Sequence, residues 1–390
     1  MKLRFAVAAT VILGLVQAQT PGKPQMSEEV FKNVQVLKGI SVDDFIGTMG
    51  LMSAGVGFDC SECHTGAGTD KVDWAADTPN KVTARKMTRM VAVINKDNFS
   101  GRQLVTCYTC HRGRDRPATT EALEAVYGPG PQDTDDVIIQ ADGQPEPTVI
   151  LDKYIAALGG AQKLAGLKSF TATGTSVGFG GFGGGGEVQL YAKAPDQRTT
   201  LIEFKDAPGR GDSVRTYNGH VGWVKTPLTI LGEYEVTGGE LDGARMDALL
   251  SFPGQLKSAL TNLRTGTPST ISDLPGPSSQ TAAQAAPGIG QDREVNIVQG
   301  VGPRGLLVTM YFDKQSGLLL RMVRASKTPI GRLNTQMDFA DYRDVNGIKF
   351  PFRLLFAWLD GRDAIQLSKI QTNAPIVETK FGRPAEVKGK

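Results

Sequence analysis

The order of apolar and polar residues divides the chain into two parts with different patterns. Residues 28–126 have a mostly helical pattern, with helix-start signals before two of its segments. Ser41 is followed three positions later by Asp44, a capping-box variant with Asp in place of the usual Glu, and Thr78 is followed by Pro79. This first part is therefore expected to be small and mainly helical.

From Thr148 onward the pattern changes to short alternating segments. A helix is expected over 148–158, where Gly159 and Gly160 provide a stop, and turn dipeptides such as Asn218-Gly219 separate several later segments. The expected strands are 168–176, 187–193, 198–205, 214–218, 221–225, 293–299, 304–313, 317–325, 332–341, 348–357 and 364–372. We expect further helix in 238–263 and a flexible surface loop over 265–291. The second part is thus predicted to be one antiparallel sheet with a few helices.

A length of 390 residues agrees with two or three domains. Met1 to Ala18 has the form of a secretory signal, with basic Lys2 and Arg4 before an apolar run. We expect an exported, periplasmic protein; an uncleaved membrane anchor is the alternative, so membrane association stays open. The predicted division is signal peptide 1–18, helical domain 19–127, linker 128–147, β-rich domain 148–378 and tail 379–390.

Composition removes some classes of function. The chain is 40% hydrophobic and 21% charged, with a formal net charge of +3, which fits a globular protein and gives no support for a nucleic-acid binder. A glycine run at 179–186 lacks the Lys-Ser/Thr of a P-loop, so a hairpin tip is the better interpretation.

All four cysteines and two of the three histidines fall in two CxxCH words. The first word holds Cys60, Cys63 and His64, and the second holds Cys107, Cys110 and His111. CxxCH is the attachment signal of c-type haem: two thiols three positions apart form thioethers, and the following His becomes an axial iron ligand. A zinc site or two CxxC disulfides are the alternatives, but neither explains a His at the same offset in both words. We expect two covalently bound haems c.

The number of histidines limits which residues can be the sixth ligand of each haem iron. Outside the two words only His220 remains, so two haems cannot both have two His ligands. Two methionine pairs precede the words on expected helices. They are Met49 with Met52 and Met87 with Met90, and spacing alone does not decide which member of each pair would ligate. His220 follows a turn signal and is expected to be exposed.

Residues 28–116 resemble the multihaem cytochrome subunit of photosynthetic reaction centres. The run from Lys81 through Met87 and Met90 to the second word carries the resemblance, together with the second word itself. The resemblance implies Met87 and Met49 as iron ligands, with Met90 and Met52 as alternatives. It covers one two-haem module, where the family subunit has two.

His/Met ligation implies six-coordinate haems of raised potential and hence outer-sphere electron transfer rather than catalysis. Arg85, Arg89 and Arg112 would tune the potentials or form a solvated helix face, and Trp74 and Tyr108 are candidates to pack on the porphyrins. We expect an electron carrier, not an enzyme, with a reaction centre or respiratory complex as redox partner. A dihaem peroxidase, or a lipid or quinone carrier with redox-sensing haems, is the alternative.

The C-terminal part is similar to the half-barrel domains of the LolA/LppX-like lipoprotein carriers. The similar segments are 154–160, 217–223, 312–318 and 341–351. The resemblance implies a cavity that could hold an apolar ligand, and a filled core is the alternative. The expected fold is therefore multidomain: a small mainly-α dihaem domain followed by an antiparallel β half-barrel (α+β) domain.

Overall fold

The structure is a computed structural model that describes most of the chain. The described residues are 23–69, 71–121, 123, 139–177, 185–204, 212–226, 231–272, 274, 291–359 and 361–385. The predicted signal peptide, most of the glycine run and much of the predicted linker lie outside them.

The N-terminal part is helical, as predicted. Its helices are α1 (Ser27–Val30), α2 (Val42–Val56), α3 (Cys60–Cys63), α4 (Pro79–Phe99) and α5 (Cys107–His111). Both predicted helix starts are confirmed by side-chain caps. The Ser41 hydroxyl accepts a hydrogen bond from the Asp44 amide at the start of α2, and the Thr78 hydroxyl accepts one from the Lys81 amide at the start of α4. Helix α2 ends at Gly57, which has a φ of 71° in the left-handed region.

The C-terminal part is built on one antiparallel sheet with flanking helices. The helices are α7 (Pro147–Ala157), α8 (Ala161–Gly166), α9 (Gly238–Leu249) and α10 (Leu256–Ala259). The strands are β1 (Ser169–Ser176), β2 (Gly186–Lys193), β3 (Gln197–Glu203), β4 (Ser213–Tyr217), β5 (Gly222–Lys225), β6 (Glu233–Val236), β7 (Thr261–Thr265), β8 (Ser269–Ser272), β9 (Asp292–Val301), β10 (Leu307–Asp313), β11 (Leu319–Thr328), β12 (Gly331–Val345), β13 (Ile348–Trp358) and β14 (Gly361–Thr372).

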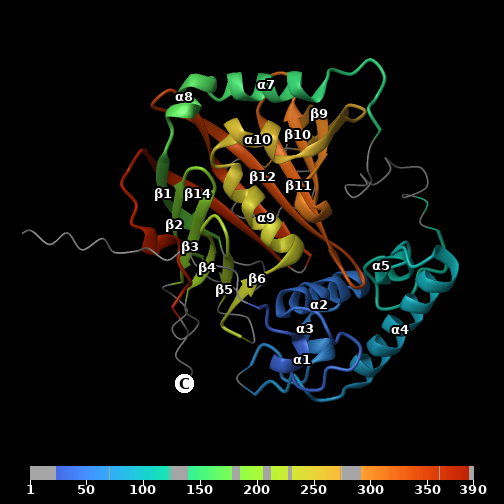
Figure 1. Ribbon diagram of the computed structural model, residues 1–390. Helices are drawn as coiled ribbons and strands as arrows, with labels where there is room; N and C mark the ends of the chain where they lie inside the picture. The colour runs from blue at the N-terminus through green and yellow to red at the C-terminus, as the bar shows by residue number, and fades with distance from the viewer. Residues whose placement is uncertain are drawn as a thin grey trace, which may run out of the picture.

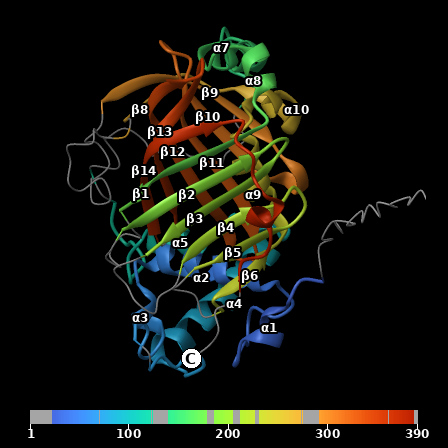
Figure 2. The ribbon, with the colours of Figure 1, turned by 90° about the vertical axis from the view of Figure 1, so that its left-hand side faces the viewer.

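The strand order joins two meanders into a single sheet. Among the described residues the order is β6-β5-β4-β3-β2-β1-β14-β13-β12-β11-β10-β9-β7, with β8 also paired to β9. The first and last strands of this part, β1 and β14, are therefore neighbours at the centre, where Phe170 pairs with Thr372. The sheet is strongly curved, α9 and α10 lie against one face, and α7 and α8 cross one end (Figures 1 and 2).

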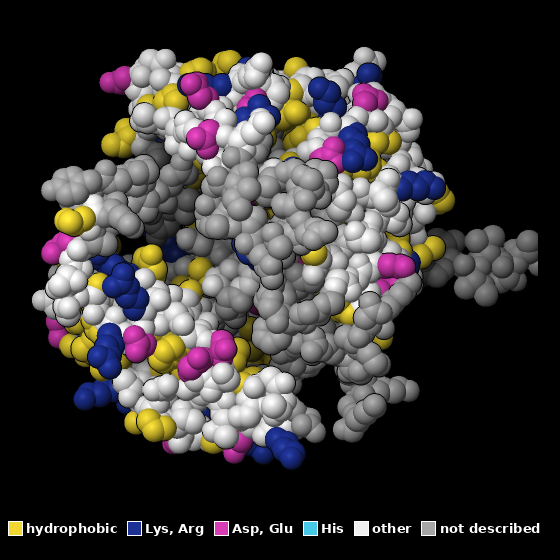
Figure 3. All heavy atoms as spheres, turned by 180° about the vertical axis from the view of Figure 1, so that it is seen from behind, with side chains coloured by type: hydrophobic (Ala, Val, Ile, Leu, Met, Phe, Trp, Pro, Cys, Tyr) yellow, Lys and Arg dark blue, Asp and Glu magenta, His cyan; other side chains and the backbone are white. Residues whose placement is uncertain are grey.

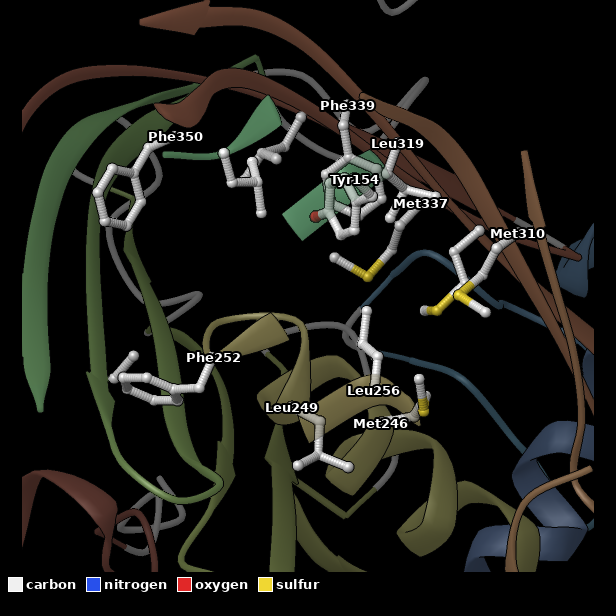
Figure 4. Close-up of a cluster of buried hydrophobic side chains, with 14 of the residues drawn as sticks. Tyr154, Met246, Leu249, Phe252, Leu256, Met310, Leu319, Met337, Phe339 and Phe350 are labelled. Carbon is white, nitrogen blue, oxygen red and sulfur yellow. The ribbon is translucent and has the colours of Figure 1, made fainter. Parts of the chain in front are cut away.

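The main hydrophobic core lies between the curved sheet and its helices. Figure 4 shows Tyr154, Met310 and Phe339 on one side of this core, facing Leu249 and Leu256 from the α9–α10 region. Alternating strand residues supply most of the buried set, as expected for a sheet covered on one face. The packing confirms the predicted α+β fold class for the C-terminal part.

The structure corrects several local predictions. The predicted strands all occur with small shifts in their ends, but β6 and the short helix α8 were not expected. The interval 238–263 is not helical throughout, because Thr261 begins strand β7. Residues 269–272 of the predicted flexible loop form β8, which pairs with β9. In the predicted tail, Phe381 is buried. Strands as short as β7 and β8 lack a periodic pattern of their own, and their pairing with β9 fixes their conformation.

The helical part contacts the sheet through α2 and the segment before α5. The Thr237 amide donates a hydrogen bond to Asp43 Oδ2 at 2.8 Å, and the Thr237 hydroxyl donates to Ser41 Oγ at 2.8 Å. Gln103 Nε2 donates to the Thr328 carbonyl at 2.8 Å. The start of α2 thus meets the start of α9, beside strands β6, β11 and β12 (Figure 1).

Candidate haem-binding site

The first CxxCH word forms one short helix with a well-made start. Asp59 is the N-cap of α3: its carboxylate accepts a hydrogen bond from the Ser61 amide at 2.6 Å, and the Asp59 amide donates to Glu62 Oε2 at 2.8 Å. Cys60 and Cys63 are three positions apart in this helix, so their thiols share one face. The local sequence therefore presents both thiols together, as attachment to one porphyrin edge requires.

His64 follows α3 directly and lies against an aromatic ring. Its imidazole and the Trp74 indole have centroids 5.0 Å apart in an edge arrangement. His64 Nδ1 is buried and has no hydrogen-bond partner among the described residues. Burial, followed by the charge of Lys81, lowers the pKa of His64. The imidazole is therefore neutral at pH 7, which is the form that binds a metal.

The second word has an oriented histidine. It forms α5, and His111 Nδ1 lies 3.0 Å from the Arg114 carbonyl oxygen, to which it can donate. A proton held on Nδ1 leaves the lone pair on Nε2. Metal-bound histidines usually have this arrangement, in which one ring nitrogen binds the metal and the other donates its N–H to an acceptor. Arg112 and Gly113 continue the chain with φ values of 53° and 76°. This left-handed turn brings the Arg114 carbonyl back to the imidazole.

Each methionine-bearing helix packs against the other helix's haem word as well as leading into its own. The N-terminus of α4 holds the first word, because the Thr78 hydroxyl donates to the Cys63 carbonyl at 2.8 Å and Asn80 Nδ2 donates to the Glu62 carbonyl at 2.9 Å. Helix α2 meets the second word at Gly55, where an added Cβ would lie 2.8 Å from the Cys107 Cβ. The two words and two long helices thus form one reciprocal unit.

Two further contacts fix the second word, and sequence reasoning missed them. The Gly113 amide donates to the Gly55 carbonyl at 3.0 Å. Buried Asn95 of α4 donates from Nδ2 to the Val105 carbonyl at 2.7 Å and accepts from the Leu104 and Val105 amides at 3.1 and 2.9 Å. The only sequence signal that Asn95 could bind the chain before the second word was its place on the apolar side of a predicted helix.

The four candidate methionines lie on the predicted helices. Met49 and Met52 are on α2, and both are partly buried. On α4, Met87 is partly buried, whereas Met90 is 43% exposed. Burial therefore favours Met87 on α4 and does not separate the pair on α2.

The alternatives to haem find no support in the arrangement of thiols. All four cysteines are free thiols, and those of the first and second words lie on separate helices. Within the described ranges, no group of three or more His, Cys, Asp or Glu side chains could hold a metal ion. Burial raises the pKa of the Cys63 and Cys107 thiols, which keeps them protonated at pH 7. Paired thiols beside an oriented imidazole fit haem c better than zinc.

The other polar and aromatic candidates divide into buried and exposed residues. The solvated-face interpretation is wrong for Arg85, which is buried and bonds Asp77 Oδ1 at 2.6 Å and the Asn33 carbonyl at 3.0 Å. It fits Arg89 and Arg112, which are exposed.

Two ring-bearing residues are also exposed. Tyr108 is 61% exposed, and His220 is an exposed turn residue, as predicted. The side chain of Asn218 accepts the His220 amide at 2.9 Å, which fixes that turn.

The helices, the thiols and the oriented imidazole point to a c-type cytochrome. Residues 3–151 match the family model described as the photosynthetic reaction centre cytochrome C subunit. The cytochrome c subunit of the Thermochromatium tepidum reaction centre is 37% identical over 111 residues, which are 27% of this chain and 25% of that protein. The Roseobacter denitrificans subunit is 32% identical over 119 residues, covering 27% of this chain and 32% of that protein.

These matches confirm the resemblance of the N-terminal part. The chain spans a quarter to a third of the length of these curated relatives. Both relatives are named as cytochrome c subunits of photosynthetic reaction centres.

The C-terminal part has counterparts among solved structures. A LolA superfamily protein from Nitrosomonas europaea matches 62% of this chain and 99% of its own, with 10% identity and a TM-score of 0.36. A DUF1329 family protein from Desulfovibrio piger matches 61% and 98%, with 12% identity and the same TM-score of 0.36. At this similarity the matches carry no information on ligand or activity.

Over the part of the chain that the structure describes, no helix is both long enough and apolar enough to cross a bilayer.

Proposed function

We propose that this chain is a periplasmic dihaem c-type cytochrome that transfers electrons by outer-sphere transfer. The observation that carries the proposal is the reciprocal unit of α2, α3, α4 and α5, in which each CxxCH word presents two thiols and a neutral or oriented imidazole. Bound haem c would supply a one-electron couple at each word. The protein's part is to fix the axial ligands and the surroundings of each group.

The proposed ligand set follows the two words. Cys60 and Cys63 would form the thioethers of one haem, and Cys107 and Cys110 those of the other. His64 with Met49, and His111 with Met87, are the proposed axial ligands, with Met52 and Met90 as the alternatives. Two nitrogen–sulfur ligand pairs leave no open iron position, and this favours electron transfer over substrate chemistry.

The test compares two methionines of one helix. Met87→Ala should remove the weak red absorption of Met–iron ligation from one haem, produce a high-spin signal and lower one reduction potential. Met90→Ala, its matched control at the more exposed position, should leave the spectrum unchanged. The opposite pattern would reassign the ligand, and no change in either variant would refute methionine ligation on α4.

The same spectra test the enzyme alternative. A dihaem peroxidase needs one iron with an open position, so it would show a high-spin signal before any substitution. It would also consume hydrogen peroxide with an electron donor. Wild-type protein with two low-spin haems and no peroxide turnover would exclude it.

We infer that the redox partner is a membrane-bound complex reached from the periplasm, either a reaction centre or a respiratory complex. On the face shown in Figure 3, the helical lobe at the lower left carries Lys and Arg side chains among Asp and Glu, with no field of one sign. If the partner docks on this face, strong charge attraction is not expected, and transfer rates should depend weakly on salt. Flash photolysis with purified reaction centres, and stopped-flow mixing with a respiratory complex, would identify the partner.

A second proposal concerns the C-terminal half-barrel, which we infer takes an apolar ligand. A cavity of about 60 Å³ supports it, lined mainly by aliphatic and aromatic side chains such as Leu158, Phe170 and Phe350. Solvent extraction of the purified protein followed by mass spectrometry tests the idea. Finding no extracted apolar molecule, together with no binding of an added one, would favour a filled core.

A further inference from the structure

A second cavity in the half-barrel combines charged and apolar walls. It has a volume of about 120 Å³ and lies between strands β3, β4, β5 and β13 and helix α9. Its charged lining consists of Arg198, Arg215, Arg324, Glu240, Asp247 and Asp363. We call it the Arg215 cavity. Charged groups that line a cavity lose part of their hydration, so each of them needs a compensating partner.

One arginine satisfies two of the acids. Arg324 is buried, and its Nη1 lies 3.1 and 3.0 Å from the two carboxylate oxygens of Glu240. Its Nε and Nη2 each lie 3.3 Å from an oxygen of Asp247. The carboxylates of Glu240 and Asp247 therefore both pair with Arg324, in the wall of the cavity.

The remaining charged groups of the lining, apart from one, have partners as well. Arg198 Nη1 donates to Ser251 Oγ at 2.8 Å. Asp363 Oδ1 accepts from Ser176 Oγ at 2.5 Å.

The exception is Arg215. Its guanidinium lies over the Phe356 ring at 4.2 Å from the centroid and over the Trp358 ring at 5.1 Å. It makes no hydrogen bond or ion pair with any residue that the structure describes. The five N–H donors of the guanidinium therefore have ring contacts, and beyond them the more distant electrostatic influence of Tyr234, Arg324, Asp247 and Glu240. Burial lowers the pKa of Arg215, which is the direction expected for a cation deprived of water.

We propose that the Arg215 cavity binds a carboxylate that carries an apolar tail, with the carboxylate on Arg215. This inference deepens the proposed apolar ligand and rests on it. A guanidinium fork matches the two oxygens of a carboxylate, and the contacts with two rings hold the guanidinium in place. A single negative charge also suits a site beside Glu240 and Asp247 better than a phosphate dianion does.

The path of the tail follows from the shared lining. Arg198 and Leu354 line both the Arg215 cavity and the smaller apolar cavity. The ligand's tail would therefore run past Leu354 toward Phe170 and Phe350, away from the charges. In this arrangement the carboxylate of the ligand lies against Arg215 and its tail lies against apolar side chains.

The experiment uses the full haem-loaded chain and two probes, decanoate and decanol, measured by isothermal titration calorimetry. Wild type should bind decanoate more tightly than decanol, and Arg215→Met should weaken decanoate binding about tenfold or more while leaving decanol unchanged. Arg343→Met is the matched control, because Arg343 also stacks on a ring, that of Phe352 at 4.5 Å, but does not line either cavity. It should bind both probes as wild type does.

The outcomes separate the two proposals. Equal binding of decanol and decanoate by wild type, or undiminished decanoate binding by Arg215→Met, would overturn the carboxylate site and leave the apolar ligand standing. No binding of either probe would overturn both. If Arg215→Met does not fold, Arg215→Lys keeps the charge without the fork and should bind decanoate with reduced affinity; unchanged affinity would remove the case for a guanidinium fork.

Discussion

Replacing Asp43 by Asn should change how stability depends on pH. Asp43 is buried at the start of α2 and accepts the Thr237 amide at 2.8 Å, so it joins the haem-bearing helix to α9. Burial raises the pKa of Asp43 well above its ordinary value, and the nearby acids Glu240 and Asp44 add to the effect. Arg324 is the charge that opposes it, together with the hydrogen bond from Thr237.

The direction of the effect follows from proton binding. Below the ordinary pKa of about 3.9, Asp43 is protonated in both the folded and the unfolded chain and adds no pH dependence. As pH rises from there to the raised native pKa, the unfolded chain releases the proton and the folded chain keeps it. Stability then falls by up to about 1.4 kcal/mol for each pH unit. Above the native pKa the loss is constant.

Asp43→Asn keeps an oxygen for the Thr237 amide but removes the titration. The variant should therefore gain stability relative to wild type as pH rises, with the difference growing from about pH 4 up to the raised native pKa by up to about 1.4 kcal/mol for each pH unit. Urea unfolding followed by circular dichroism measures it, with exposed Asp142→Asn as the control. Parallel pH profiles for wild type and Asp43→Asn would refute the reasoning.

Three other substitutions test the packing of the two parts. Gly55→Ala adds a methyl 2.8 Å from the Cys107 Cβ, so it should lower the free energy of unfolding by about 1–3 kcal/mol and lower the amount of haem attached per chain. Gly166→Ala is the control, because an added Cβ there meets nothing within 4 Å and should change neither quantity. Equal haem content in the two variants would contradict the contact between Gly55 and Cys107. Asn95→Leu removes three hydrogen bonds and should lower the free energy of unfolding by about 2 kcal/mol or more, so an unchanged melting temperature would argue against the clamp. Arg324→Met removes the cation that pairs with the partly buried Glu240 and Asp247 and should cost about 3–5 kcal/mol in urea unfolding. A loss below about 1 kcal/mol would show that the two carboxylates relax to solvent.

The helices of the N-terminal part could be predicted closely, because their signals are local. Two CxxCH words place thiols and a His within five consecutive residues, so no long-range contact is needed to recognise them. Helix starts at Ser41 and Thr78 depend on side chains that bond amides three positions away. The axial methionines remain a prediction, since spacing narrows them to pairs and burial favours only Met87.

Contacts between distant residues were beyond the sequence pattern. Arg85 has the same local setting as a solvated helix residue, and only its ion pair with Asp77 and its bond to the Asn33 carbonyl make it a buried one. Strand β8 lies in a segment of loop-like composition and exists because it pairs with β9. Such positions depend on partners that a local pattern does not contain.

The sequence by itself determined that at most two c-type haems are possible, that both cannot have two His ligands, and that a helical part precedes an antiparallel one. Composition and short-range periodicity are sufficient for these conclusions, because they concern residue identity and bonds within a few positions. Only the tertiary structure decided which helix packs on which haem word and how α2 joins α9 through Asp43 and Thr237. It alone brought Arg215, from strand β4, to a cavity without an acidic partner of its own. Its neighbours across that cavity come from distant parts of the chain, and they make an ordinary strand arginine a candidate anion site.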